Sequence, residues 1–157
     1  MATIFTKGDL FDTDGVRAYA FATNAEGTMD TGIAVTVRKR FPKMGEALVA
    51  KAKEGKLALG DVLEHREKDE TVFALVIQET EMKKAKFSAL TKAAQRLVEL
   101  ATAAKLERVG LFHPGLGKAS LEWKRVKNIL TEIGDETDVA LVVIEQFVRK
   151  KPEAKPE

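Results

Sequence analysis

Two glycine-bearing loops decide the expected fold of this chain, Asn24-Ala25-Glu26-Gly27-Thr28-Met29-Asp30-Thr31-Gly32-Ile33-Ala34 and His113-Pro114-Gly115-Leu116-Gly117-Lys118-Ala119-Ser120. Each loop follows an apolar run and precedes a helical pattern. Glycines and the first turn of a helix leave backbone N–H groups pointing outward, and the helix dipole adds partial positive charge at the same place. The two loops therefore predict an anion site, and on neighbouring strands they can hold a diphosphate.

Strand-like and helix-like patterns alternate along the rest of the chain. Alternating or continuous apolar runs predict strands over residues 3–5, 16–22, 61–65, 71–77, 108–112 and 137–144. Apolar residues three and four apart predict helices over residues 32–41, 43–54, 88–105 and 121–133. Such alternation predicts a mixed α/β sheet covered by helices on both faces. Ligands of open α/β sheets bind beyond the carboxyl ends of the strands, where both glycine loops begin.

Several local features sharpen these expectations. Residues 8–11 are expected to form a turn, and the charged residues 66–70 a solvated hairpin connection. The run at residues 137–144 is apolar throughout, which predicts burial on both faces of the sheet. Trp123 is expected to anchor its helix to the core through its spacing with Val126 and Leu130. The other aromatic residues expected in the core are Phe21, Phe112 and Phe147.

Composition narrows the classes of protein that remain. The chain has 157 residues, 45% of them apolar, which is enough to form one hydrophobic core. We expect a single domain over residues 1–148 and a charged, disordered tail over residues 149–157. Net charge is only +2, so no broad nucleic-acid or membrane surface is expected. The chain contains no cysteine and only two histidines, His65 and His113, so no metal site is expected. No signal peptide or membrane span is recognisable, and the expected location is cytoplasmic.

The order of these motifs resembles the macro domain family. The resemblance rests on Gly8-Asp9-Leu10-Phe11, on the run from Thr23-Asn24 to Met29-Asp30-Thr31-Gly32-Ile33-Ala34, and on Lys39-Arg40-Phe41-Pro42. In the second half it rests on Pro114-Gly115-Leu116-Gly117 followed by Leu121-Glu122-Trp123. The chain is most similar to the branch that contains terminal ADP-ribose glycohydrolase and the DNA ADP-ribosyl glycohydrolase antitoxins, over residues 2–147. The resemblance implies a three-layer α/β/α macro-domain fold with a mixed central sheet.

The resemblance also implies a set of ligand contacts. Asp9 would accept a hydrogen bond from the adenine amino group, although Gly-Asp also favours a turn. Asn24 would face the distal ribose, or serve only as a strand-end residue. Ser120 would cap the following helix and lie near phosphate. The full implied set is Asp9, Leu10, Asn24, Gly27, Thr31, Gly32, Ile33, Pro114, Gly115, Leu116, Gly117, Lys118, Ala119 and Ser120.

The chain departs from the branch where its hydrolases carry their catalytic groups. The resemblance implies a lysine just after the strand at residues 71–77 and, in some members, an aspartate in the second loop. This chain has Gln78 and Ala119 there, neither of which can act as a nucleophile or an acid/base group. Asp30, Glu79 and Gln78 remain as candidates for a different chemistry, with exposed loop residues as the alternative interpretation. His113 either titrates near the ligand or serves a structural role.

The function that follows is binding of ADP-ribose or an ADP-ribosylated macromolecule, as a reader or sequestering module without a cofactor. One alternative is an ADP-ribosyl glycohydrolase with a noncanonical acid/base group. Another is a protein-interaction module that has lost nucleotide binding. Nucleic acid is expected only as a modified substrate, and the sequence leaves the oligomeric state open.

Overall fold

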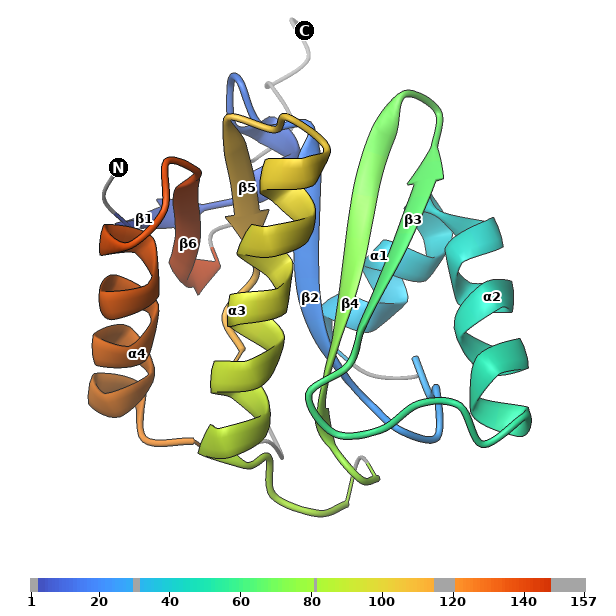
Figure 1. The fold of residues 1–157 in the computed structure, drawn as a ribbon. Helices are drawn as coiled ribbons and strands as arrows, with labels where there is room; N and C mark the ends of the chain where they lie inside the picture. The colour runs from blue at the N-terminus through green and yellow to red at the C-terminus, as the bar shows by residue number, and fades with distance from the viewer. Residues whose placement is uncertain (1–2, 30–31, 81, 115–120, 148–157) are drawn as a thin grey trace, which may run out of the picture.

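The computed structural model describes residues 3–29, 32–80, 82–114 and 121–147. It contains one six-stranded sheet in the order β1-β6-β5-β2-β4-β3 (Figure 1). The strands are β1 Thr3–Gly8, β2 Ala18–Asn24, β3 Val62–Glu67, β4 Glu70–Gln78, β5 Arg108–Leu111 and β6 Ala140–Phe147. Only β3 runs antiparallel to its neighbour, and every other neighbouring pair is parallel. The predicted mixed sheet is therefore confirmed.

Helices cover both faces of the sheet. Helices α1 (Ile33–Arg40) and α2 (Pro42–Lys53) pack on one face, and α3 (Phe87–Ala103) and α4 (Trp123–Asp135) on the other (Figure 1). Strand β6 contributes Leu141 and Val143 to one apolar cluster and Val142 and Ile144 to the other, so its predicted burial on both faces is confirmed. The three-layer α/β/α architecture is confirmed too. Within the described ranges, none of the helices has the length and apolar content that crossing a bilayer requires.

The bounds predicted from local sequence patterns agree with the observed bounds of most helices and strands to within a few residues. The predicted core face of α3 is buried at Leu90, Ala94, Leu97 and Ala101. Phe21 and Phe112 are buried as predicted, whereas the side chain of Phe147 lies outside the described structure. The expected turn at residues 8–11 overlaps the end of β1 at Gly8 and a short 3-10 helix, η1 (Leu10–Asp12). The predicted tail at residues 149–157 also lies outside the described residues.

The prediction of a solvated charge cluster at residues 66–70 is wrong for two of its members. The turn consists only of Lys68 and Asp69, both with positive φ; Arg66 and Glu67 belong to β3 and Glu70 to β4, and of these three only Arg66 is exposed. Glu70 accepts hydrogen bonds from the Arg40 guanidinium at 3.0 Å and the Tyr19 hydroxyl at 2.8 Å. These partners replace water around a carboxylate that is only 13% exposed. Burial, with the neighbouring Glu70 carboxylate, raises the pKa of Tyr19 to about 12.

Gly27 fixes how closely the first glycine loop approaches α2. Its φ of +72° is one that side chains other than glycine rarely adopt. A Cβ atom at this position would lie 3.1 Å from both the Leu48 carbonyl oxygen and the Ala52 Cβ atom. The loop therefore rests on α2 only because residue 27 has no side chain.

We predict that Gly27→Ala lowers the free energy of unfolding by about 2 to 4 kcal/mol, the sum of left-handed backbone strain and overpacking. Gly55→Ala is the matched control, because Gly55 has a similar φ of +68° and no heavy atom within 4 Å of its added Cβ. Urea-induced unfolding of both variants and the wild type measures these changes in the free energy of unfolding. Equal losses for the two variants would contradict the proposed contact with α2.

Candidate functional site

The carboxyl ends of five parallel strands meet at one edge of the sheet. Gly8 at the end of β1 is paired with Phe147 at the end of β6, and Asn24 at the end of β2 with Gln78 at the end of β4. The central strand β5 stops earlier, at Leu111, which is level with Ala20 and Val143. Its neighbours β2 and β6 each continue four residues farther. The carboxyl edge of the sheet is therefore recessed at β5 by about 13 Å, because a strand rises roughly 3.3 Å per residue.

The chain reverses its direction of winding at this recess. After β2 it continues to β3 and β4 on one side, whereas after β5 it continues to β6 on the other side (Figure 1). Open α/β sheets bind ligands at such a switch point, beyond the carboxyl ends of the strands. The first glycine loop leaves β2, and the second follows β5 through His113 and Pro114. Two loops predicted from sequence thus begin on the two adjacent strands of the switch point.

Asn24 organises the first loop from within. Its side-chain oxygen accepts the N–H groups of Glu26 at 3.0 Å and Thr28 at 3.3 Å, and its nitrogen donates to the Thr28 hydroxyl at 2.7 Å. The Ala25 N–H also donates to the Gln78 carbonyl at 2.9 Å. Asn24 is only 3% exposed, so most of its hydrogen-bonding capacity serves the loop. These contacts favour the strand-end interpretation and leave one amide hydrogen for a ligand.

The loop ends at the open N-terminus of α1. Gly32 precedes the helix with a φ of +60°, and an added Cβ there would meet no atom within 4 Å. Among the described residues no side chain caps this end, and the first turn of the helix contains no acidic residue. The N–H groups of Ile33 and Ala34 have no acceptor within the helix, because the first turn of an α-helix leaves its donors unpaired. Asp30 and Thr31 lie outside the described residues.

Asp9 and Leu10 lie just after the end of β1. The Asp9 carboxylate accepts the Phe11 N–H at 3.1 Å and thereby caps η1, as the turn interpretation predicted. Leu10 is fully buried, and it contacts Gly110 of β5 so closely that a Cβ on Gly110 would lie 2.7 Å from its Cδ2 atom. This packing fixes Asp9 beside the recess. The Leu10 side chain belongs to the core, so only its backbone is available to a ligand.

Gln78 and Glu79 occupy the place where the resemblance implied a lysine. The Gln78 amide donates to the Lys83 carbonyl at 2.7 Å and is only 9% exposed. Glu79 is exposed and forms ion pairs with Lys83 at 2.7 Å and Lys86 at 3.7 Å. The hydrogen bond from Lys83, with the charge of that ammonium group, lowers the pKa of Glu79. A lowered pKa favours the carboxylate and opposes a role as general acid.

Sequence reasoning did not predict a stacked pair of rings that joins the start of the second loop to the helix after it. The rings of His113 and Trp123 stack at 3.9 Å between centroids, and the Trp123 indole N–H donates to Glu145 at 3.1 Å. Trp123 also meets Phe5 edge-on, so it packs at the rim of the core. Burial lowers the pKa of His113, which favours the neutral imidazole. The stack fixes the backbone at Pro114, whereas Gly115, Leu116, Gly117, Lys118, Ala119 and Ser120 lie outside the described residues.

The described residues contain no group of three or more histidine or acidic side chains arranged to hold a metal ion. The site they do form consists of backbone donors, a helix N-terminus and a few polar side chains that are mainly bound to the protein itself. Such a site can bind and orient an anionic ligand through preorganised dipoles.

Comparisons with known proteins agree with this geometry. No protein-family model matches the chain. The human ADP-ribose glycohydrolase OARD1 is 22% identical over 139 residues, which cover 88% of each chain. Among solved structures, the macrodomain of Thermus aquaticus DarG superimposes with a TM-score of 0.82 at 20% identity, covering 91% of this chain and 97% of that one.

A second solved structure is Thermosipho africanus DarTG in complex with ADP-ribose. It superimposes with a TM-score of 0.78 at 14% identity and covers 98% of this chain and 43% of that one. The predicted resemblance is therefore confirmed at the level of the fold. The chain has the macrodomain fold, and it resembles macrodomains of the DarG and ADP-ribose glycohydrolase type.

Proposed function

We propose that this protein binds ADP-ribose, or an ADP-ribosylated macromolecule, in the recess between its two glycine loops and acts as a reader or sequestering module. The observation that carries the proposal is the departure of both loops from β2 and β5, the adjacent strands of the switch point. The similarity to a structure in complex with ADP-ribose supports the choice of ligand. A cytoplasmic location stays a prediction.

In this proposal the diphosphate is bound by backbone groups. The N–H groups at the start of α1, after Gly32, donate to one phosphate, and the second loop after Pro114 provides donors for the other. Gly27 lets the first loop reach the ligand, and Ile33 lies at the helix N-terminus. Because α1 has no acidic residue in its first turn, the helix dipole favours an anion there.

Asp9 is proposed to recognise adenine while it caps η1. One carboxylate oxygen accepts the Phe11 N–H, and the other is available for the exocyclic amino group of adenine. A carboxylate has about four lone-pair positions, so the two roles are compatible. The remaining Asn24 amide hydrogen is proposed to donate to a ribose hydroxyl.

The choice of reader over hydrolase rests on Gln78 and Glu79. Gln78 cannot act as a nucleophile or titrate, and its amide is held by the Lys83 carbonyl. Glu79 is paired with two lysines in its charged form. The alternative activity, hydrolysis of an ADP-ribosyl bond, is favoured by the similarity to a human ADP-ribose glycohydrolase. That chemistry would need Asp30 or a ligand-bound water instead.

We predict that calorimetric titration with ADP-ribose gives saturable binding, weakened at least about tenfold in Asp9→Asn, because a hydrogen bond to a charged acceptor is lost. Asparagine keeps an oxygen that can cap η1, so the fold is expected to persist. Asp12→Asn is the matched control, since Asp12 is exposed on the same short helix. No binding by the wild type, or equal affinities for the two variants, would contradict the proposal.

We also predict that the wild type releases no ADP-ribose from ADP-ribosylated protein or ADP-ribosylated DNA beyond the rate without protein. Chromatographic detection of free ADP-ribose measures the release under conditions that saturate binding. Release that disappears in Asp30→Ala but persists in Glu26→Ala, an exposed acid in the same loop, would establish the hydrolase alternative instead.

A further inference from the structure

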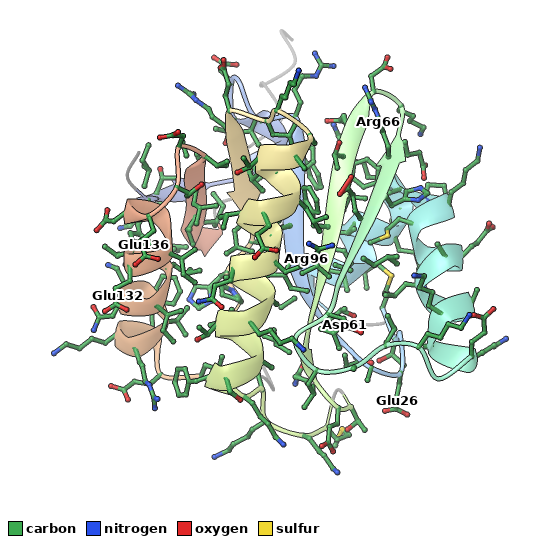
Figure 2. All side chains as sticks on the ribbon, in the orientation of Figure 1. Glu26, Asp61, Arg66, Arg96, Glu132 and Glu136 are labelled. Atoms are coloured by element: carbon green, nitrogen blue, oxygen red, sulfur yellow. The ribbon has the colours of Figure 1, made fainter. Side chains whose placement is uncertain are left out.

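A second hollow lies away from the recess, at the opposite edge of the sheet from β1. It is bounded by the end of α2, the start of β3 and the exposed side of α3, and has a volume of about 360 Å³. That volume lies within the range of small-ligand and peptide pockets. Figure 2 labels Arg96 on α3 and Asp61 just before β3 beside this groove, with Arg66 farther along the same strand. The groove belongs to none of the contacts proposed for ADP-ribose.

The wall of this groove is fixed by local packing. Gly60 is buried, and an added Cβ there would lie 2.5 Å from the Lys92 Cδ atom, so the lysine stem lies directly on the glycine. The Gly60 N–H donates to the Val76 carbonyl at 2.7 Å, and the Ala58 N–H to the Asp61 carboxylate at 2.9 Å. The groove is therefore a defined surface of the folded chain.

Cations outnumber anions around the groove. Lys51, Lys56, Lys92 and Arg96 line it, against the carboxylates of Asp61 and Glu99. Asp61 already accepts a backbone N–H, Arg96 is paired with Glu99 at 3.2 Å, and Lys56 is paired with Glu54 at 3.1 Å. Among the described residues, the Lys51 and Lys92 ammonium groups have no hydrogen-bond or ion-pair partner. The charge of the groove therefore suits an acidic occupant.

One wall of the groove is an open strand edge. Strand β3 pairs only with β4. The Val76 N–H donates to the Asp61 carbonyl, so residues 63, 65 and 67 continue the bonds to β4, while Val62, Glu64 and Arg66 direct their N–H and C=O groups outward. Half-buried Val62, Leu63 and Leu57 provide apolar surface next to these groups. An edge of this kind can accept another strand.

We propose that this groove docks an extended, acidic polypeptide segment that adds to β3 as an extra strand. A segment with alternating acidic and apolar residues matches the lysines, the apolar wall and the outward backbone groups together. A phosphodiester chain would use only the cations and would leave the strand edge and the leucines without partners. The chain's own residues 148–157 are an unsuitable occupant, because they contain four basic and two acidic residues.

The test uses a fluorescein-labelled peptide Glu-Val-Glu-Val-Glu-Val-Glu and fluorescence anisotropy. We expect saturable binding that weakens with added salt, no binding of the peptide with lysine in place of glutamate, and no binding of oligothymidylate. Reversal of two exposed charges in Lys92→Glu/Arg96→Glu is expected to weaken binding about tenfold. Lys53→Glu/Lys124→Glu, which reverses two charges outside the groove, is the matched control.

Strand addition is tested at Glu64. Glu64→Pro removes an outward N–H and also removes a negative charge, so charge alone predicts tighter peptide binding whereas strand pairing predicts its loss. Glu64→Ala, which keeps the N–H, is expected to bind at least as well as the wild type. In the wild type, amide NMR signals of Val62, Glu64 and Arg66 are expected to shift on titration with the acidic peptide. ADP-ribose affinity should stay unchanged in all these variants.

Three results would overturn the proposal. They are no binding of the acidic peptide, equal binding of oligothymidylate, and equal peptide affinities for Glu64→Pro and Glu64→Ala. Because the groove lies apart from the glycine loops, failure here leaves the ADP-ribose titration interpretable. If the wild type bound the acidic peptide but not ADP-ribose, the proposed function would fail and the peptide groove would still be supported.

Discussion

The parallel pairing of the short strand β5 between the longer strands β2 and β6 is the constraint on which the proposed site depends. It sets the recess in the sheet edge and places the starts of both glycine loops beside each other. Gly110 makes this arrangement possible, because Leu10 packs against the strand where a side chain would otherwise lie. The same contact brings Asp9, from the far edge strand β1, toward the centre of the sheet. One packing contact thus links the fold to the residue proposed to recognise adenine.

Polar side chains around the recess are mainly engaged with the protein. Asn24 holds the first loop, Gln78 holds the loop after β4, and Asp9 caps η1. In the part of the chain that the structure describes, backbone N–H groups and the dipole of α1 are then the principal groups available to a ligand. Such groups bind an anion without transferring protons, since their protonation does not change near neutral pH. The described part of the site therefore supports the proposal of recognition.

Local patterns predicted the elements because each element buries a face with its own period. The spacing of Leu90, Ala94, Leu97 and Ala101 is enough to predict α3, and the continuous apolar run is enough to predict β6. The loops could be placed at the carboxyl edge because topology alone decides where parallel strands end. The burial of Glu70 by Arg40 and Tyr19, and the stack of His113 on Trp123, could not be predicted in this way. The Glu70 contacts join residues 30 and 51 positions apart, and the His113–Trp123 stack spans the second glycine loop, so no helix or strand period encodes them.

The most direct test of the central claim is to map ADP-ribose binding by amide NMR on the wild-type protein. The account predicts that the largest shifts occur at residues 24–34, at Asp9 and Leu10, and from His113 to Leu121. Residues 58–66, which lead into β3 and form most of it, stay unchanged. Shifts confined to other parts of the molecule, or no shifts with ADP-ribose in large molar excess, would contradict the assignment of the recess as an ADP-ribose site.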